Sequence, residues 1–328
     1  MNIATLNIQQ IVERSKQTFD ETALEVFRYQ AAGNPIYRDY IRALGVHAED
    51  VHQLIDIPFL PISFFKTHAV QSGTWEPEVV FTSSGTTGAT TSKHAVPSVT
   101  SYLSHCEAIF ETAYGPLQTY CILALLPSYL ERSGSGLVNM VEGFMARSKH
   151  PQQGYFLYNY EDLAQRLAHL EAEGQKTLLI GVTFGLLDFA ASRPMPLHHT
   201  IVMETGGMKG RQKELTRAEV HAQLADAFGL PQIQSEYGMT ELSSQAYSQG
   251  NGIYAPGAGM RVFVREPTDP LSCAQEGSGG LNIIDLANLH TCSFIATEDL
   301  GKVYSDGRFE VLGRFDQSDA RGCNLMVV

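Results

Sequence analysis

A stretch rich in serine, threonine and glycine occupies residues 82–93 (TSSGTTGATTSK), directly after the apolar run 79–81. Such a loop can surround phosphate with hydroxyl groups and backbone N–H donors, and glycine lets the backbone approach closely. It is not a Walker A motif, because Thr90 stands where that motif requires its second glycine. A solvated linker has the same composition, but the position after an apolar strand favours phosphate binding. The candidate phosphate-binding residues are Ser83, Ser84, Gly85, Thr86, Thr87, Gly88 and Lys93.

Four later segments also combine glycine with residues that suit nucleotide or metal binding. They are Glu204-Thr205-Gly206-Gly207, Tyr237-Gly238-Met239-Thr240-Glu241, Thr297-Glu298-Asp299-Leu300-Gly301 and Gly313-Arg314-Phe315-Asp316. Singly, each has a structural explanation, such as a core tyrosine, an aspartate in a turn or a surface arginine. Together and in this order with the first loop, they resemble the motifs of the adenylate-forming superfamily. That superfamily includes acyl- and aryl-CoA synthetases, peptide-synthetase adenylation domains and firefly luciferase.

The resemblance implies a site for ATP and Mg²⁺. Adenine would stack on the flat backbone of Thr205, Gly206 and Gly207, and Tyr237, Gly238 and Met239 would complete the nucleotide site. Thr240 would bind the adenylate phosphate, and Glu241 would hold Mg²⁺, a hard cation that accepts carboxylate oxygen. Asp299 would accept the ribose hydroxyls, and Arg314 would contact ribose or phosphate. One departure is Glu298, where the family usually has glycine.

The C-terminal segment resembles one subfamily, the LuxE-type acyl-protein synthetases. Ordinary superfamily members continue past the hinge at Asp316 into a mobile domain that supplies a catalytic lysine, and we expect that domain to be absent here. Lys93, Lys209 and Arg211 are candidates for the missing cation. The residues 57–66 (IPFLPISFFK) also resemble the subfamily's N-terminal signature.

Cys323 has a counterpart in that subfamily, where a cysteine near the end of the chain becomes acylated. Thiolate attack on an acyl-adenylate would release AMP and leave an enzyme thioester. Arg321 would favour the thiolate, and Gly322 would add backbone freedom. Without the resemblance, packing of Cys323 in a final strand is the favoured interpretation. The subfamily implies a long-chain fatty acid as substrate and an acyl reductase of the LuxC type as partner.

Two alternatives remain open. The first is an enzyme similar to phenylacetate-CoA ligase, acting on aryl acids with a separate thiol acceptor. The second is a non-catalytic relative that binds nucleotide or acyl-adenylate.

Helical and strand patterns alternate along the chain, which predicts an α/β fold. We expect the adenylate-forming large domain at 1–312, with parallel sheets flanked by helices, and a hinge-like segment and C-terminal arm at 313–328. Residues 1–55 should be helical. Helices are expected near 98–114, 137–147, 160–173 and 217–228, and strands at 79–81, 120–126, 177–182, 199–203 and 233–237. A small antiparallel region should contain strands at 262–265, 280–284, 293–296, 302–304 and 308–312.

Composition narrows the function classes. The net charge of −12 over 328 residues gives no global attraction for nucleic acid. The N-terminus lacks the apolar core of a signal peptide, and no apolar run reaches the length of a membrane span. Five scattered cysteines indicate neither a disulfide framework nor a zinc site, and reduced thiols fit the cytoplasm. We interpret Cys106, Cys121, Cys273 and Cys292 as structural.

Overall fold

The computed structural model describes residues 3–83, 91–126, 134–206 and 215–315. Its α-helices are α1 (Ile8–Ser15), α2 (Phe19–Gly33), α3 (Pro35–Ala43), α4 (Phe64–Thr67), α5 (Val99–Tyr114), α6 (Gly136–Ser148), α7 (Tyr160–Ala172), α8 (Thr183–Ser192) and α9 (Arg217–Phe228). Its strands are β1 (Leu60–Pro61), β2 (Val79–Thr82), β3 (Lys93–Val96), β4 (Cys121–Leu125), β5 (Gly154–Phe156), β6 (Thr177–Val182), β7 (Thr200–Thr205), β8 (Gln234–Tyr237), β9 (Ala246–Ser248), β10 (Ile253–Pro256), β11 (Met260–Glu266), β12 (Asp269–Ala274), β13 (Gly277–Asp285), β14 (Phe294–Val303) and β15 (Phe309–Arg314).

One large mixed sheet organises the described chain. Its strand order is β12-β11-β13-β14-β15-β10-β9-β8-β7-β6-β4-β5, and β1 joins it beside β14. The strands β5, β4, β6, β7 and β8 are parallel, whereas those from β9 to β12 along this path are antiparallel. The expected α/β fold with flanking helices is confirmed.

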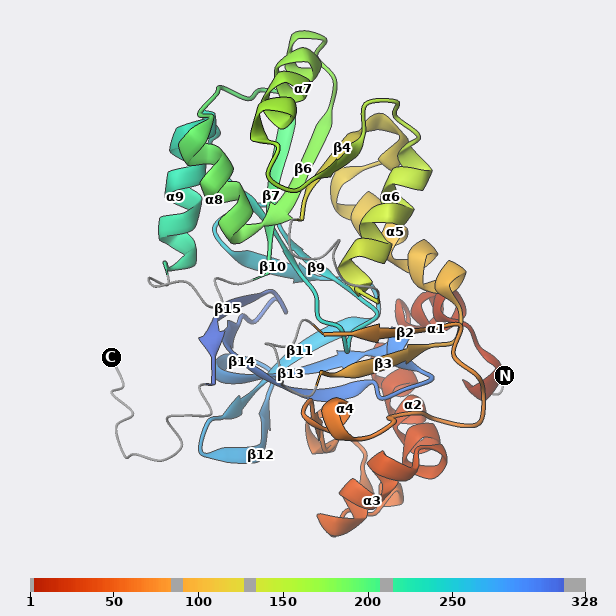
Figure 1. Ribbon diagram of the computed structural model, residues 1–328. Helices are drawn as coiled ribbons and strands as arrows, with labels where there is room; N and C mark the ends of the chain where they lie inside the picture. Colours follow the sequence, from red (N-terminus) through yellow and green to blue (C-terminus); the bar gives the residue numbers. More distant parts are fainter. Residues whose placement is uncertain (1–2, 84–90, 127–133, 207–214, 316–328) are drawn as a thin grey trace.

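Helices cover both faces of the parallel strands. Side chains on β4 and β6 alternate between two cores, because successive residues of a strand point to opposite faces. Ile122 and Leu178 pack with α5 and α6, whereas Leu123 and Leu179 pack with α7, α8 and α9. Figure 1 shows α5 and α6 on one side of these strands and α8 and α9 on the other.

The N-terminal helices pack on the antiparallel half of the sheet. Tyr37 of α3 stacks on Phe294 of β14 with ring centroids 6.0 Å apart, and Phe27 of α2 meets Phe294 edge-on. The buried Gln30 side chain donates 3.0 Å hydrogen bonds to the carbonyls of Asn288 and Leu289. The helical segment therefore shares its core with the strands that follow Gly259.

Local signals define several elements. Thr216 and Glu219 form a capping box at the start of α9, and Gly229, with φ of +62°, ends the helix. The predicted helix Arg217–Phe228 and the predicted strand Thr177–Val182 are both confirmed, and their observed bounds equal the predicted ones. No helix within the described ranges is long and apolar enough to cross a membrane.

The prediction of two separate strands at 293–296 and 302–304 is wrong, because both belong to β14. Glycine in the middle of this segment resembles a turn signal, yet it permits close strand approach. A Cβ at Gly301 would lie 2.2 Å from the carbonyl oxygen of Glu310 on β15. The antiparallel region is continuous with the parallel strands, since β9 and β10 connect it to β8.

Candidate active site

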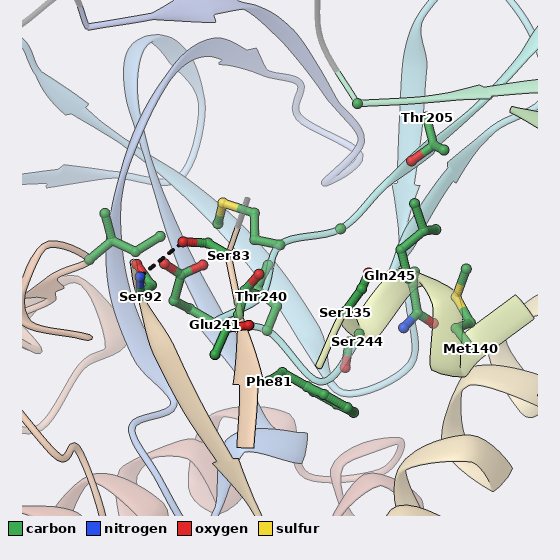
Figure 2. Close-up of a pocket in the computed structure, with 18 of the residues that line it drawn as sticks. Phe81, Ser83, Ser92, Ser135, Met140, Thr205, Thr240, Glu241, Ser244 and Gln245 are labelled. Carbon is green, nitrogen blue, oxygen red and sulfur yellow. Dashed lines mark hydrogen bonds between the residues drawn. The ribbon is translucent and has the colours of Figure 1, made fainter. Parts of the chain in front are cut away.

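A cavity of about 400 Å³ lies at the carboxyl edge of the parallel strands, where ligands bind in open α/β sheets. Residues from all five motif segments line it: Ser83 and Ser92, Thr205 and Gly206, Gly238 to Glu241, Glu298, and Arg314. In Figure 2, Ser83, Ser92 and Glu241 lie near one end of the pocket, and Met140 and Gln245 lie near the other. Distant parts of the sequence thus meet in one site.

Ser83 and Ser92 hold together the two ends of the predicted phosphate loop. The Ser92 N–H donates to the Ser83 hydroxyl at 2.9 Å, and the Ser83 N–H donates to the Ser92 carbonyl at 3.1 Å. The predicted contacts Ser84, Gly85, Thr86, Thr87 and Gly88 lie outside the described residues. Lys93 is exposed on β3 and is not among the residues that line the cavity.

The segment after β8 lies along the cavity from Gly238 to Leu242. Directly after this segment, the Asp285 carboxylate accepts hydrogen bonds from the N–H groups of Ser243 and Ser244 at 2.9 Å. The Ser244 hydroxyl donates to the same carboxylate at 2.7 Å. Asp285 is a positioning residue with no signal in the motifs themselves.

Glu241 lies buried at the cavity wall. Burial raises the pKa of its carboxyl, against the opposing effects of the Ser92 hydroxyl, Arg314 and Lys66. Within the described residues, no cluster of three or more metal-binding side chains occurs. Mg²⁺ bound with ATP uses one or two carboxylates together with phosphate oxygens, so a single buried carboxylate fits this ion.

Asp299, Arg314 and Glu298 gather at the β14–β15 end of the site. Arg314 Nε lies 3.1 Å from Asp299 Oδ1, and Tyr237 donates a 2.8 Å hydrogen bond to Asp299 Oδ2. Glu298, the departure from the family pattern, lies 3.6 Å from both Arg314 and Lys66.

Lys66 was not predicted as a site residue, yet it lines the cavity. Its position follows from parallel pairing of β1 with β14, in which Leu60 is opposite Ile295 and Pro61 opposite Ala296. A pairing of two residues leaves no periodic signal in the sequence. The candidate cations Lys209 and Arg211 lie outside the described residues.

Thr205 ends β7, and Gly206 follows it at the cavity. Gly206 has φ of +82°, and a Cβ added there would meet nothing within 4 Å. The backbone at this point is therefore an open, flat surface of the kind that suits an aromatic ring. Gly207 lies outside the described residues.

His94, Cys106, Cys121 and Cys292 are buried, and Cys273 is half-buried. His94 Nδ1 lies 2.8 Å from the Thr240 carbonyl, and burial lowers the pKa of its imidazole to about 4. Burial raises the pKa of Cys106, Cys121 and Cys292 to about 12 and that of Cys273 to about 11. These four thiols fit the structural role expected of them. Cys323 lies outside the described residues.

The fold is shared with solved structures of other proteins. Apo MatB from Rhodopseudomonas palustris superposes with a TM-score of 0.53 and 17% identity, covering 72% of this chain and 48% of MatB. The luciferase-like enzyme from the nonluminescent Zophobas morio mealworm superposes with a TM-score of 0.52 and 14% identity, and the match covers 96% of this chain and 76% of that enzyme. A long-chain-fatty-acid-CoA ligase (FadD1) from Archaeoglobus fulgidus superposes with a TM-score of 0.51 and 13% identity. The match covers 74% of this chain and 52% of the ligase.

These structures have the fold of the adenylate-forming superfamily, and this chain shares that fold. The chain spans about half the length of MatB. No protein-family model matches the sequence, and no curated protein matches it.

Proposed function

We propose that the protein is an adenylate-forming ligase, which uses ATP to activate a carboxylic acid as its acyl-adenylate. The substrate carboxylate oxygen attacks the α-phosphorus, the bond to the bridging oxygen breaks, and pyrophosphate leaves. The observation that carries the proposal is the convergence of five motif segments on one cavity.

Each group in the cavity has a chemical task in this proposal. Ser83 and Ser92 hold the loop that would receive the phosphates, and Thr240 would donate to the α-phosphate. Asp299, held by Tyr237 and Arg314, would accept the ribose hydroxyls. Mg²⁺, held by Glu241, would neutralise charge on the phosphate oxygens.

The finer proposal is that the acid is a long-chain fatty acid and that Cys323 takes the acyl group as a thioester. It rests on the resemblance to LuxE-type synthetases. The raised pKa values of Cys106, Cys121, Cys273 and Cys292 support it, because the thiolate is the nucleophile and these four thiols hold their protons at neutral pH. An acyl reductase would then collect the acyl group.

Exchange of labelled pyrophosphate into ATP tests the first step. Exchange that depends on an added acid is expected, with myristate and phenylacetate as probes of the fatty-acid and aryl-acid alternatives. A chain that shows no exchange with any acid, yet binds nucleotide, is the non-catalytic relative.

Intact-protein mass tests the second step after incubation with Mg·ATP and myristate. We expect a hydroxylamine-labile acyl adduct on the wild type and on the control Cys273→Ser, and none on Cys323→Ser. Exchange without an adduct on any of the three proteins would favour a separate thiol acceptor.

A further inference from the structure

Two glutamates on neighbouring strands have different surroundings. Glu204 of β7 lies 3.3 Å from Arg217 Nε and 3.5 Å from His221 Nε2, so it belongs to a charged cluster behind the cavity. Glu236 of β8 is opposite Thr205 in the sheet. Glu236 lines the cavity and has no ion pair with any lysine, arginine or histidine of the described residues.

Glu236 is buried, with 6% of the residue exposed. Its carboxyl has one hydrogen-bond partner in the described part of the chain. The Thr205 hydroxyl donates to Oε2 at 2.5 Å. Burial raises the pKa of this carboxyl to about 7. The hydrogen bond from Thr205 lowers the pKa, and the negative charge of Glu204 raises it further. A buried carboxyl that has a raised pKa and no cation among the described residues, at a cavity wall, is a candidate ligand-binding group.

Gln245 adds a second acceptor on the same wall. It is 4% exposed, its Nε2 lies 3.0 Å from Cys106 Sγ, and its Oε1 has no hydrogen-bond partner in the described residues. A Cβ placed on Gly238 would lie 2.4 Å from Glu236 Oε1 and 3.8 Å from Gln245 Cγ. Both side chains therefore lie beside Gly238, where the missing side chain leaves room for the carboxyl.

Apolar side chains also line the cavity, among them Phe81 and Met140. Tyr102, another lining residue, uses its hydroxyl in a 3.3 Å hydrogen bond to the Gly136 carbonyl. Figure 2 shows Gln245 and Met140 on the side of the pocket away from Ser92. The wall thus combines hydrocarbon surface with two acceptors whose hydrogen-bonding capacity is not used by the described protein.

We propose that Glu236 and Gln245 bind a hydrogen-bond-donating substituent, a hydroxyl or an ammonium group, on the carboxylic acid that the enzyme activates. This inference rests on the proposed function and names the class of its substrate. A site built to bond a substrate donor discriminates strongly against the analogue that lacks it, because its buried polar groups are then left unpaired.

The test is pyrophosphate exchange with two series of acids, one based on hexanoate and one on tetradecanoate. Each series contains the unsubstituted acid and acids that carry one hydroxyl or one amino group, placed at successive carbons. We expect at least one substituted acid to exceed its unsubstituted parent by about tenfold or more in kcat/KM. In Glu236→Gln and in Gln245→Leu, the ratio of kcat/KM for the substituted acid to kcat/KM for its parent should fall by about tenfold. The control Glu142→Gln, an exposed carboxylate on α6, should keep the wild-type ratio.

The pH profile separates the two donors. Preference for an ammonium group should rise as pH passes about 7 and Glu236 ionises, whereas preference for a hydroxyl should change little. Exchange in which every substituted acid is no better than its parent, or a ratio unchanged in both variants, would overturn the inference and leave the proposed function intact. Absence of exchange with every acid would instead overturn the proposed function.

Discussion

The hydroxyl of Tyr237 donates a 2.8 Å hydrogen bond to Oδ2 of Asp299, which lies 62 positions later in the chain. Arg314 Nε lies 3.1 Å from the other carboxylate oxygen. Two motif residues thus fix the orientation of a third, and all three come from different strands. The arrangement leaves the direction of the Asp299 carboxylate determined before any ligand binds.

We predict that Tyr237→Phe raises the KM for ATP by about threefold to tenfold and changes kcat less. One hydrogen bond to a charged group contributes about 1.5 to 3 kcal/mol, and part of that is recovered by Arg314. Tyr114→Phe is a matched control, because the Tyr114 hydroxyl is buried without a hydrogen-bond partner in the described residues. An unchanged KM in Tyr237→Phe would mean that Asp299 does not contact the nucleotide.

The sequence was sufficient to predict elements with strong local signals. The helix Arg217–Phe228 has a capping box and a glycine stop, and the strand Thr177–Val182 is wholly apolar. The helix Thr183–Ser192 was missed, because its apolar residues follow no helical period beside that strand. The order of the motif segments predicted which residues of the cavity would meet, although their roles in catalysis stay predictions.

Residues that act through non-local contacts could not be predicted. Lys66 reaches the site through the short β1–β14 pairing, and Asp285 acts on Ser243 and Ser244 from 41 or 42 positions away. His94 is buried, and its ring nitrogens lie within hydrogen-bond distance of the Thr240 carbonyl and the Thr291 hydroxyl. The contacts of Asp285 and His94 leave no pattern in the neighbouring sequence, and the segment 57–66, which contains Lys66, resembled a subfamily signature without indicating a role in the site.

A second prediction concerns Lys66 as the cavity's cation for phosphate. Lys66→Met should lower kcat/KM for ATP in pyrophosphate exchange by about tenfold, which is about 1.4 kcal/mol of transition-state stabilisation. Lys16→Met, an exposed lysine paired with Glu13, serves as control. If exchange by Lys66→Met stays within about twofold of the wild type, Lys66 serves only as the ion-pair partner of Glu298.

A third prediction concerns Glu241 and magnesium. Glu241→Gln keeps the shape of the side chain but removes its charge, so exchange should require a Mg²⁺ concentration at least about tenfold higher for half-maximal rate. The exposed Glu266→Gln should behave as the wild type. A Mg²⁺ dependence that is unchanged in Glu241→Gln would assign the ion to phosphate oxygens alone.

A fourth prediction follows from His94. Burial lowers the pKa of His94 from 6.5 to about 4, so the unfolded chain binds a proton in this range while the folded chain does not. The contribution of His94 to the free energy of unfolding is fully present above pH 6.5. It decreases as the pH falls towards 4, by about 3 kcal/mol in total. Urea unfolding at pH 7.5 and 4.5 should show a smaller acid-induced loss in His94→Gln than in the wild type. Equal losses in both proteins would contradict the assignment.

The last prediction tests whether Asp285 holds the segment after β8. Its carboxylate accepts bonds from the Ser243, Ser244 and Ala287 N–H groups and from the Ser244 hydroxyl. Asp285→Ala would leave these buried donors without an acceptor, and each such donor costs about 1 to 3 kcal/mol. We expect a loss of about 3 kcal/mol or more in the free energy of unfolding, measured in urea.

Asp39→Ala is the matched control, because Asp39 is exposed and lies 3.6 Å from Arg38. It should change the free energy of unfolding by less than about 1 kcal/mol. If Asp285→Ala unfolds at ambient temperature, Asp285→Asn provides a milder test, since an amide oxygen accepts from the same N–H groups at lower strength. A stability of Asp285→Ala equal to that of the control would show that the Gly238–Leu242 wall is held by other contacts.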